Sequence, residues 1–180
     1  KIFKSFNLNV VNIAHLKLIF DIKFNIDNVK ELGSDRIANS VAAVKKFGKN
    51  CLIVDFGTAT TFDIIKNNIY QGGVISPGVH ISHNSLVYAA SKLKKISITK
   101  INKITGKNTI TAMQSGFYWG YISLINGIIL KIIEEQSYKP QIILTGGLSK
   151  LFKSKIIYKS KIVPNLTLEG LHYIGLKFYD

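Results

Sequence analysis

Apolar residues follow two different spacings along this chain, one typical of helices and the other typical of strands. Residues 34–47 carry apolar side chains such as Ile37 and Val41 on one helical face, and Ser34 stands where an N-cap is expected. The uninterrupted apolar run at 51–54 is typical of a strand that is buried on both faces. The first half of the chain therefore predicts a helix that leads into a central strand.

The remaining elements repeat this alternation. Further strands are predicted at 16–20, 22–24, 60–65, 69–75 and 141–144, and further helices at 80–92, 108–136 and 166–178. Residues 94–107 are basic and lack a regular period, so they are expected to form an irregular loop. Strands that alternate with helices along a chain are typical of an α/β fold.

The longest uncharged run, at 108–130, is long enough to span a bilayer. It also carries polar side chains, among them Gln114 and Asn126, and three glycines at 116, 120 and 127. These residues favour a buried helix of a soluble protein, and no membrane partner is expected. Cys51 is the one cysteine, which excludes a disulfide framework and suits the reducing cytoplasm.

A formal net charge of +14 raises the question of nucleic-acid binding. The lysines are spread along the chain, however, and only residues 92–95 form a tight cluster. Neither a zinc-finger spacing nor an RNA-recognition consensus is present in the sequence. The abundance of Ile, Lys and Asn is also what an A+T-rich genome produces. No specific nucleic-acid partner is expected.

Arg36 is the only arginine among 24 basic residues, and it lies in the sequence Leu32-Gly33-Ser34-Asp35-Arg36. A guanidinium group can grip a carboxylate or a phosphate with two parallel hydrogen bonds, which lysine cannot do. The alternative is an ordinary ion pair with Asp35 at the start of a helix. The motif therefore indicates either an anion-binding residue or a local salt bridge.

A second motif, Asp55-Phe56-Gly57-Thr58-Ala59-Thr60-Thr61-Phe62-Asp63, follows the buried strand. An aspartate that ends such a strand lies at the carboxyl edge of the sheet, where open α/β folds place their ligands. Gly57 permits a close approach of the backbone, and Thr58 offers a hydroxyl group to a phosphate. A hairpin with a polar turn is the alternative. The Asp-Phe-Gly of protein kinases is excluded, since their other motifs are missing.

Other residues carry weaker signals. His80 and His83 could share a helical face, but they have no acidic neighbour in the sequence, so a metal site is not expected there. The aromatic residues at 117, 118, 119 and 121 are expected in the core or at a dimer contact rather than in a platform for stacking bases.

Five ordered motifs together resemble the type III pantothenate kinases, which belong to the superfamily of acetate kinase, sugar kinases, Hsp70 and actin. The motifs are Leu32–Arg36, Asp55–Asp63, Gly72-Gly73-Val74-Ile75-Ser76-Pro77-Gly78, Lys107-Asn108-Thr109 with Ser115-Gly116, and Thr145-Gly146-Gly147. The resemblance implies an actin-like (ribonuclease H-like) α/β ATPase fold of two similar lobes, the first of them incomplete. Residues 1–48 would belong to the first lobe and residues 49–180 to the second.

The resemblance also implies an activity, the ATP-dependent phosphorylation of pantothenate that opens coenzyme A biosynthesis. Gly33, Ser34, Asp35 and Arg36 would line the pantothenate pocket, and Thr109 would contact the same substrate. Asp35 would act as the general base that takes the proton of the attacking hydroxyl. Arg36 suits a substrate that ends in a carboxylate.

The nucleotide and the ions would bind beside this pocket. Gly57, Thr58, Gly146 and Gly147 would contact ATP, which arrives with Mg²⁺. Asp55 would hold the monovalent cation, K⁺ or NH₄⁺, that the family requires, because a hard cation prefers oxygen ligands. The family is dimeric, and the glycine-bearing long helix is the expected contact of a homodimer.

The chain departs from the family pattern at three points. Ile26 and Val29 stand where the family has a substrate-contacting tyrosine and a proline, and no Asp-x-Gly-Asn-Thr phosphate loop precedes them. These departures predict a carboxyl-terminal part of the enzyme, whose activity alone is doubtful. The alternatives are a non-catalytic remnant or half of a split kinase, assembled with a separately encoded amino-terminal half, and a basic accessory protein in gene regulation.

Overall fold

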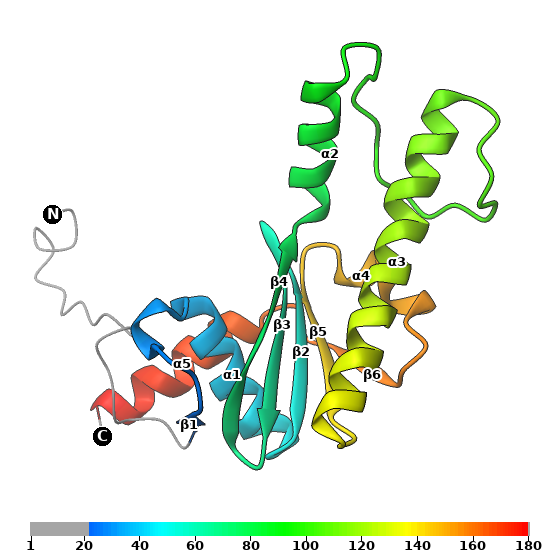
Figure 1. The fold of residues 1–180 in the computed structure, drawn as a ribbon. Helices are drawn as coiled ribbons and strands as arrows, with labels where there is room; N and C mark the ends of the chain where they lie inside the picture. The colour runs from blue at the N-terminus through cyan, green and yellow to red at the C-terminus, as the bar shows by residue number, and fades with distance from the viewer. Residues whose placement is uncertain (1–21, 180) are drawn as a thin grey trace, which may run out of the picture.

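The computed structural model describes residues 22–179, and Figure 1 shows their arrangement. The strands are β1 (Lys23–Phe24), β2 (Cys51–Phe56), β3 (Ala59–Lys66), β4 (Ile69–Pro77), β5 (Gln141–Gly146) and β6 (Ser160–Ile162). The α-helices are α1 (Ser34–Phe47), α2 (Val79–Ala89), α3 (Thr109–Gln136), α4 (Ser149–Phe152) and α5 (Leu166–Tyr179). Two short 3₁₀ helices cover Val29–Glu31 and Lys153–Lys155.

Most of the predicted elements are confirmed, including both ends of α1 and the irregular loop before α3. Three details were wrong. Gly33 and not Ser34 is the N-cap of α1, because the Gly33 carbonyl already accepts the first helical bond, from the Ile37 amide over 3.1 Å. Helix α2 ends at Ala89, ahead of the predicted Lys92, and β5 runs on to Gly146. The strand predicted at 16–20 lies outside the described residues.

The strands form one sheet in the order β1-β4-β3-β2-β5-β6. Strands β2, β3 and β4 are an antiparallel meander, whereas β5 and β6 join β2 in parallel. Parallel strands put their carboxyl ends at the same edge of a sheet. The end of β2 therefore lies beside the end of β5, with Asp55 opposite Thr145 and Phe56 opposite Gly146.

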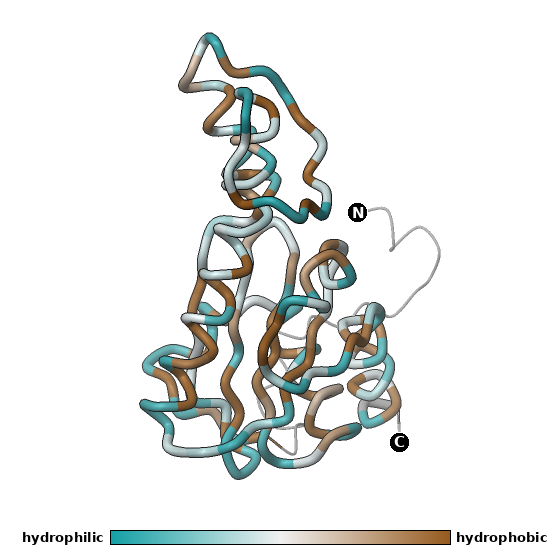
Figure 2. The backbone as a smooth tube through the Cα atoms, turned by 90° about the vertical axis from the view of Figure 1, so that its right-hand side faces the viewer, coloured by the Kyte–Doolittle hydropathy of each residue, from teal (hydrophilic) through white to brown (hydrophobic). Residues whose placement is uncertain are grey.

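Helices cover both faces of the sheet (Figure 1). Alternate residues of β2 point to opposite faces, so Cys51 and Ile53 join the core under α1 and α5, while Leu52 and Val54 join the core under α3 and α4. Figure 2 shows apolar residues along the strands and along the helices that cover them. A strand buried on both faces explains the unbroken apolar run that β2 displays in the sequence.

Helix α2, the loop after it and the first turns of α3 project beyond the carboxyl edge of the sheet (Figure 1). Tyr121 of α3 lies beside that edge. Its hydroxyl donates to the carbonyl of Pro77, the last residue of β4, over 3.1 Å and lies 2.6 Å from Ser82 Oγ. By length and composition α3 could cross a membrane, a weak criterion that core helices of soluble proteins also meet. Ile125 and Ile129 of α3 are fully buried against the sheet.

Candidate functional site

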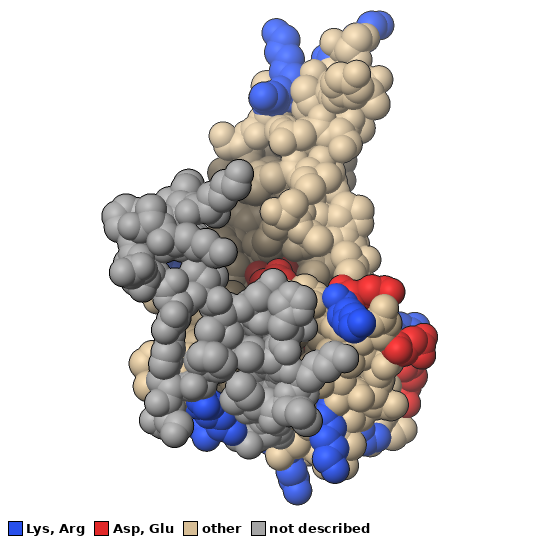
Figure 3. Space-filling model, turned by 90° about the vertical axis from the view of Figure 1, so that its left-hand side faces the viewer, with Lys and Arg blue, Asp and Glu red and all other residues tan. Residues whose placement is uncertain are grey.

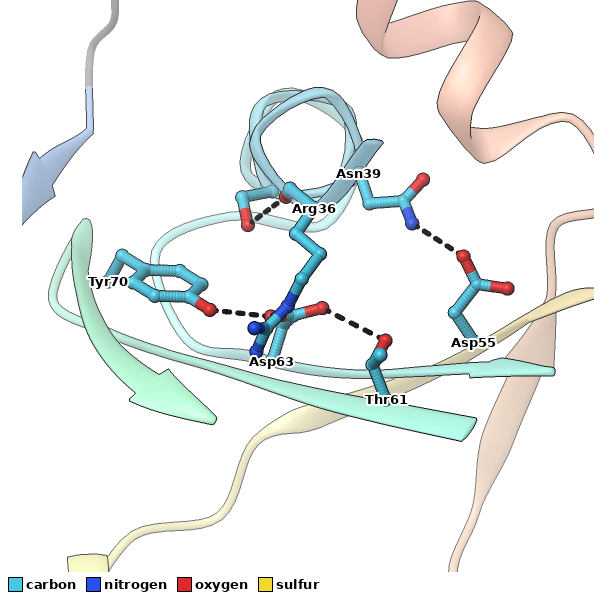
Figure 4. A network of polar contacts seen from close by, with 7 residues as sticks. Arg36, Asn39, Asp55, Thr61, Asp63 and Tyr70 are labelled. Carbon is cyan, nitrogen blue, oxygen red and sulfur yellow. Dashed lines mark hydrogen bonds and ion pairs between the residues drawn. The ribbon is translucent and has the colours of Figure 1, made fainter. Parts of the chain in front are cut away.

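Two acidic residues of the sheet face α1 because of the strand alternation. Asp55 follows Cys51 and Ile53 on the α1 face of β2, and Asp63 lies opposite Ile53 on β3. Helix α1 runs across this face, and its first turns carry Asp35, Arg36 and Asn39. The two sequence motifs therefore meet between one helix and the strands beneath it (Figure 4).

Arg36 binds an aspartate of the sheet and not its neighbour in the sequence. Its Nε and Nη2 atoms each lie 2.8 Å from Oδ1 of Asp63, a residue 27 positions further along the chain. The Arg36 side chain is 14% exposed and that of Asp63 is fully buried. The local ion pair with Asp35 that the sequence left open is thus replaced by a buried pair between α1 and β3.

Further groups surround the Asp63 carboxylate. The hydroxyl of Tyr70 on β4 donates to Oδ1 over 2.6 Å, and Thr61 Oγ1 donates to Oδ2 over 3.5 Å. Burial raises the pKa of Asp63, and the charge of Arg36 and the hydrogen bond from Tyr70 oppose that rise. Because three donors aim at one oxygen, the arrangement fits an ionised carboxylate.

Asp55 has a different partner. Oδ2 of Asp55 accepts a hydrogen bond from Asn39 Nδ2 over 2.9 Å, and Asn39 Oδ1 accepts one from Thr167 of α5 over 2.7 Å. Burial raises the pKa of Asp55; the Asn39 bond lowers it, and the charge of Asp35 raises it. Asp35 itself is exposed in the first turn of α1. The two carboxylates are therefore close enough to repel each other.

The surroundings of Asp55 fit a cation held by oxygen atoms. A Cβ placed on Gly146 would lie 2.6 Å from both Asp55 Oδ1 and the Phe56 carbonyl oxygen, so a side chain there would collide with both atoms. Glycine thus leaves these oxygens close together at the sheet edge. Within residues 22–179 no group of three His, Cys, Asp or Glu side chains could hold a metal ion, so a cation at this position would be held by one carboxylate and main-chain carbonyls.

Three of the four residues expected to contact ATP line one cavity. Gly57 and Thr58 form the turn between β2 and β3, Gly147 follows β5, and together they border a cavity of about 370 Å³. Phe56, His80, Ile81 and Leu148 complete its lining. Gly146, the fourth expected residue, lies at the end of β5 with a φ of +83°, a left-handed conformation that glycine adopts without strain.

Thr109 does not lie with the other expected substrate residues. It is the first residue of α3, which begins with a capping box formed by Asn108 and Thr111. Twelve residues separate it from Tyr121, so at 1.5 Å per residue Thr109 lies about 18 Å beyond the sheet edge. Thr109, Gly116 and Gly120 instead line an apolar groove of about 940 Å³ between α2 and α3.

The sequence interpretation missed Asn39, Asp63 and Tyr70 as parts of this site. One signal was available, since Asp63 interrupts the apolar pattern of β3 and a buried acid requires a partner. His83 Nε2 accepts a hydrogen bond from the Ile96 amide over 3.2 Å. Phe117, Tyr118 and Tyr121 are core residues, as expected.

Ile26, an expected departure from the family pattern, lies beside Gly72 of β4. Ile26 is partly buried, and its Cγ2 atom lies 3.7 Å from the position of a Cβ on Gly72.

Lysine side chains are dispersed over the surface drawn in Figure 3, and acidic atoms lie in the hollow between the projecting part and the body. The charge of the molecule is therefore not gathered into one basic patch on this face.

The fold and the clustered site define an actin-like α/β protein with acidic residues and a cavity of about 370 Å³ at one sheet edge. Residues 1–131 match the family described as Type III pantothenate kinase, and the chain belongs to this family. It is 46% identical over 149 residues to a type III pantothenate kinase of Koribacter versatilis, and 42% identical over 168 residues to that of Pelagibacter ubique.

These relatives are longer than the chain. The alignments include 82% and 93% of this chain, but only 54% and 67% of the respective relatives. A solved structure from Campylobacter jejuni, assigned to the Baf family of transcriptional activators, superposes with a TM-score of 0.63 at 23% identity. That superposition covers 91% of this chain and 72% of the other, and it supports the fold alone.

Proposed function

We propose that this protein transfers the γ-phosphate of ATP to the primary hydroxyl of pantothenate, giving 4′-phosphopantothenate in the first step of coenzyme A biosynthesis. The observation that carries the proposal is the meeting of the Asp35–Arg36 turn, Asp55 and the cavity beside Thr58 at one edge of the sheet. A phosphoryl transfer needs an acceptor site, a charge-balancing site and a phosphate site in contact with one another. Family membership supports the same reaction.

Asp35 is the general base in this proposal. It is exposed at the start of α1, where it can accept the proton of an incoming hydroxyl group. Gly33 and Ser34 line the pantothenate pocket, and Arg36 binds the carboxylate at the other end of the substrate.

The nucleotide occupies the side of the edge formed by Gly57, Thr58, Gly146 and Gly147. Gly57, Thr58 and Gly147 line the cavity beside this edge, where main-chain amides and the Thr58 hydroxyl would bind the phosphate groups. Asp55 binds K⁺ or NH₄⁺ between the two substrates, and Mg²⁺ arrives with ATP. Bound cations would neutralise the charge that develops on the transferred phosphate.

Two copies of the chain pair through α3 in this proposal. An added Cβ on Gly116, Gly120 or Gly127 would meet no atom of residues 22–179 within 4 Å, so this side of the helix has room for close packing. Thr109 lies far along α3 from its own sheet edge, and in a dimer it would contact the pantothenate of the other copy. Sedimentation should show a dimer that Gly120→Leu converts to a folded monomer; a monomeric parent would contradict this arrangement.

The remaining expectations also stand as proposals. Residues 1–48 are assigned to the first lobe and residues 49–180 to the second, although β1 and α1 pack on the same sheet as the later elements. A separately encoded amino-terminal half could complete the nucleotide site. The protein acts in the cytoplasm without a membrane or a specific nucleic acid. The dispersed lysines support weak binding of nucleic acid that moderate salt abolishes.

Calorimetric titration with pantothenate, followed by an assay of phosphate transfer from ATP, tests the proposed reaction. The 180 residues contain no Asp-x-Gly-Asn-Thr segment, so transfer is measured with the chain joined to the amino-terminal residues of the Pelagibacter ubique relative. Binding with transfer is expected. Binding without transfer would favour the non-catalytic remnant. Tight, salt-resistant binding of one DNA sequence without pantothenate binding would favour the accessory role in gene regulation.

A further inference from the structure

Among the described residues, Asp63 binds the guanidinium group of Arg36 along the edge formed by Nε and Nη2, and the Tyr70 hydroxyl also interacts with this group. Nε and Nη2 both donate to Asp63, and no hydrogen bond from residues 22–179 is found at Nη1, which forms the outer edge together with the second hydrogen of Nη2. Two parallel donors along that edge match the two oxygens of a carboxylate. The Arg36–Asp63 pair therefore still leaves a bidentate donor for a ligand.

The stability of the fold alone does not explain a buried aspartate at position 63. A charge pair buried beneath a helix loses its hydration, and an apolar pair of similar size is often as stable or more stable. Asp63 nevertheless lies fully buried between Phe62 and Ile64, which are both core residues. The three residues that donate to it come from α1, β3 and β4, so the carboxylate joins three elements at the position of Arg36.

Strand β4 also approaches the guanidinium closely. A Cβ on Gly73 would lie 2.5 Å from Arg36 Nη2 and 2.1 Å from the Phe62 carbonyl oxygen. Any larger residue at this position would displace either the strand or the guanidinium group. Gly73 thus leaves Arg36 room on the side of β4, while Asp63 lies beneath it and Tyr70 holds Asp63 (Figure 4).

We infer that Asp63 and Tyr70 are positioning residues for Arg36. They fix the edge of the guanidinium group formed by Nε and Nη2, so that the outer edge, formed by Nη1 and Nη2, recognises the carboxylate of pantothenate. Neither residue touches the substrate. Their effect is selectivity for an acid over a neutral analogue, because a fixed guanidinium fork discriminates by geometry as well as by charge. This inference rests on the proposed function, in which Arg36 faces pantothenate.

The test compares the binding of pantothenate with that of pantothenol, the alcohol that has CH₂OH in place of the carboxylate. Calorimetry on the chain should give an affinity ratio of roughly tenfold or more in favour of pantothenate. The ratio should fall at least about threefold in Tyr70→Phe and approach one in Asp63→Asn, as it does in Arg36→Lys. Tyr88→Phe removes a hydroxyl from a side chain that is 95% exposed, and it should keep the parental ratio.

The outcomes separate this inference from the proposed function. If Arg36→Lys abolishes the ratio while Tyr70→Phe and Asp63→Asn keep it, the positioning role is wrong and pantothenate recognition stands. If the parent binds both compounds with equal affinity, Arg36 does not recognise the carboxylate of pantothenate and the inference fails. If the parent binds neither compound, the proposed function fails as well. Should Asp63→Asn not fold, Tyr70→Phe, which deletes one oxygen only, decides the question.

Discussion

Asn39 donates a hydrogen bond from Nδ2 to Oδ2 of Asp55 over 2.9 Å, and it thereby joins helix α1 to the end of strand β2. The orientation of this amide is fixed from the other side, because Thr167 of α5 donates to Asn39 Oδ1 over 2.7 Å. Asn39 is fully buried. The carboxylate that we propose as the cation ligand is therefore held by a chain of hydrogen bonds that begins in the last helix.

Replacing the buried Asn39 by alanine should lower the free energy of unfolding by about 1 to 3 kcal/mol, since its two half-buried partners, Asp55 and Thr167, each lose a hydrogen bond. Urea denaturation measures the change. Asn84→Ala is the matched control, because Asn84 is an exposed residue of helix α2. Its effect should stay within about 0.5 kcal/mol. Equal effects of the two substitutions would show that the Asn39 bonds contribute no net stability.

Asp55 should make the stability of the liganded protein depend on K⁺ or NH₄⁺. A ligand that binds only the folded state raises its melting temperature by mass action. With pantothenate and ATP present, the parent should melt higher in KCl than in tetramethylammonium chloride of equal ionic strength, and Asp55→Asn should lose this difference. Asp27→Asn, at an exposed acid, should keep it. The cation role fails if Asp55→Asn responds to K⁺ as the parent does.

The packing of α5 on α1 predicts opposite effects at two glycines of one helix. A Cβ on Gly170 would lie 1.9 Å from the Ala38 carbonyl oxygen, whereas one on Gly175 would meet no atom within 4 Å. Gly170→Ala should destabilise the fold by about 1 to 3 kcal/mol through overpacking. Gly175→Ala should stabilise it by up to about 1 kcal/mol through helix propensity. Thermal or chemical unfolding that shows the same sign for both would contradict the packing of α5 against α1.

Local patterns were enough to predict much of the fold. The period of apolar residues gave both ends of α1, and the continuous apolar run of β2 indicated a strand with helices on both sides. The three-residue strand β6 and the four-residue helix α4 were missed, because elements this short carry no measurable period.

The site was predicted less completely, for a geometric reason. The resemblance to the family directed attention to Asp55 and Thr58, which the structure places at one edge of the sheet. It could not give the partner of Arg36, because the pair with Asp63 depends on the register between β2 and β3, which sets Asp63 opposite Ile53. Likewise, only the direction in which α3 projects shows that Thr109 lies far from the other substrate residues.

Cys51 should be chemically inert in the folded protein. The thiol is fully buried, donates to the Gly48 carbonyl over 3.2 Å, and burial raises its pKa to about 12 from the ordinary value of 9.0. A thiol-specific reagent at pH 8 should label it only after denaturation. Rapid labelling of the native chain would show that Cys51 is accessible.

The same shift in pKa has a consequence for stability at alkaline pH. Between pH 9 and pH 12 the unfolded chain loses the Cys51 proton while the folded protein retains it, so rising pH favours unfolding. The free energy of unfolding of the parent should therefore fall more steeply than that of Cys51→Ala, by up to about 1.4 kcal/mol per pH unit. Parallel pH profiles of the two proteins would contradict a buried, protonated thiol.

The account depends most on Asp35 as the base that activates pantothenate. The direct measurement is transfer of labelled γ-phosphate from ATP to pantothenate, in the chain joined to the amino-terminal residues of the Pelagibacter ubique relative. Asp35→Asn should lower turnover by roughly a hundredfold or more, as loss of a general base does, while pantothenate binding measured by calorimetry stays within a few-fold of the parent. Turnover of Asp35→Asn within a few-fold of the parent would contradict the proposed mechanism.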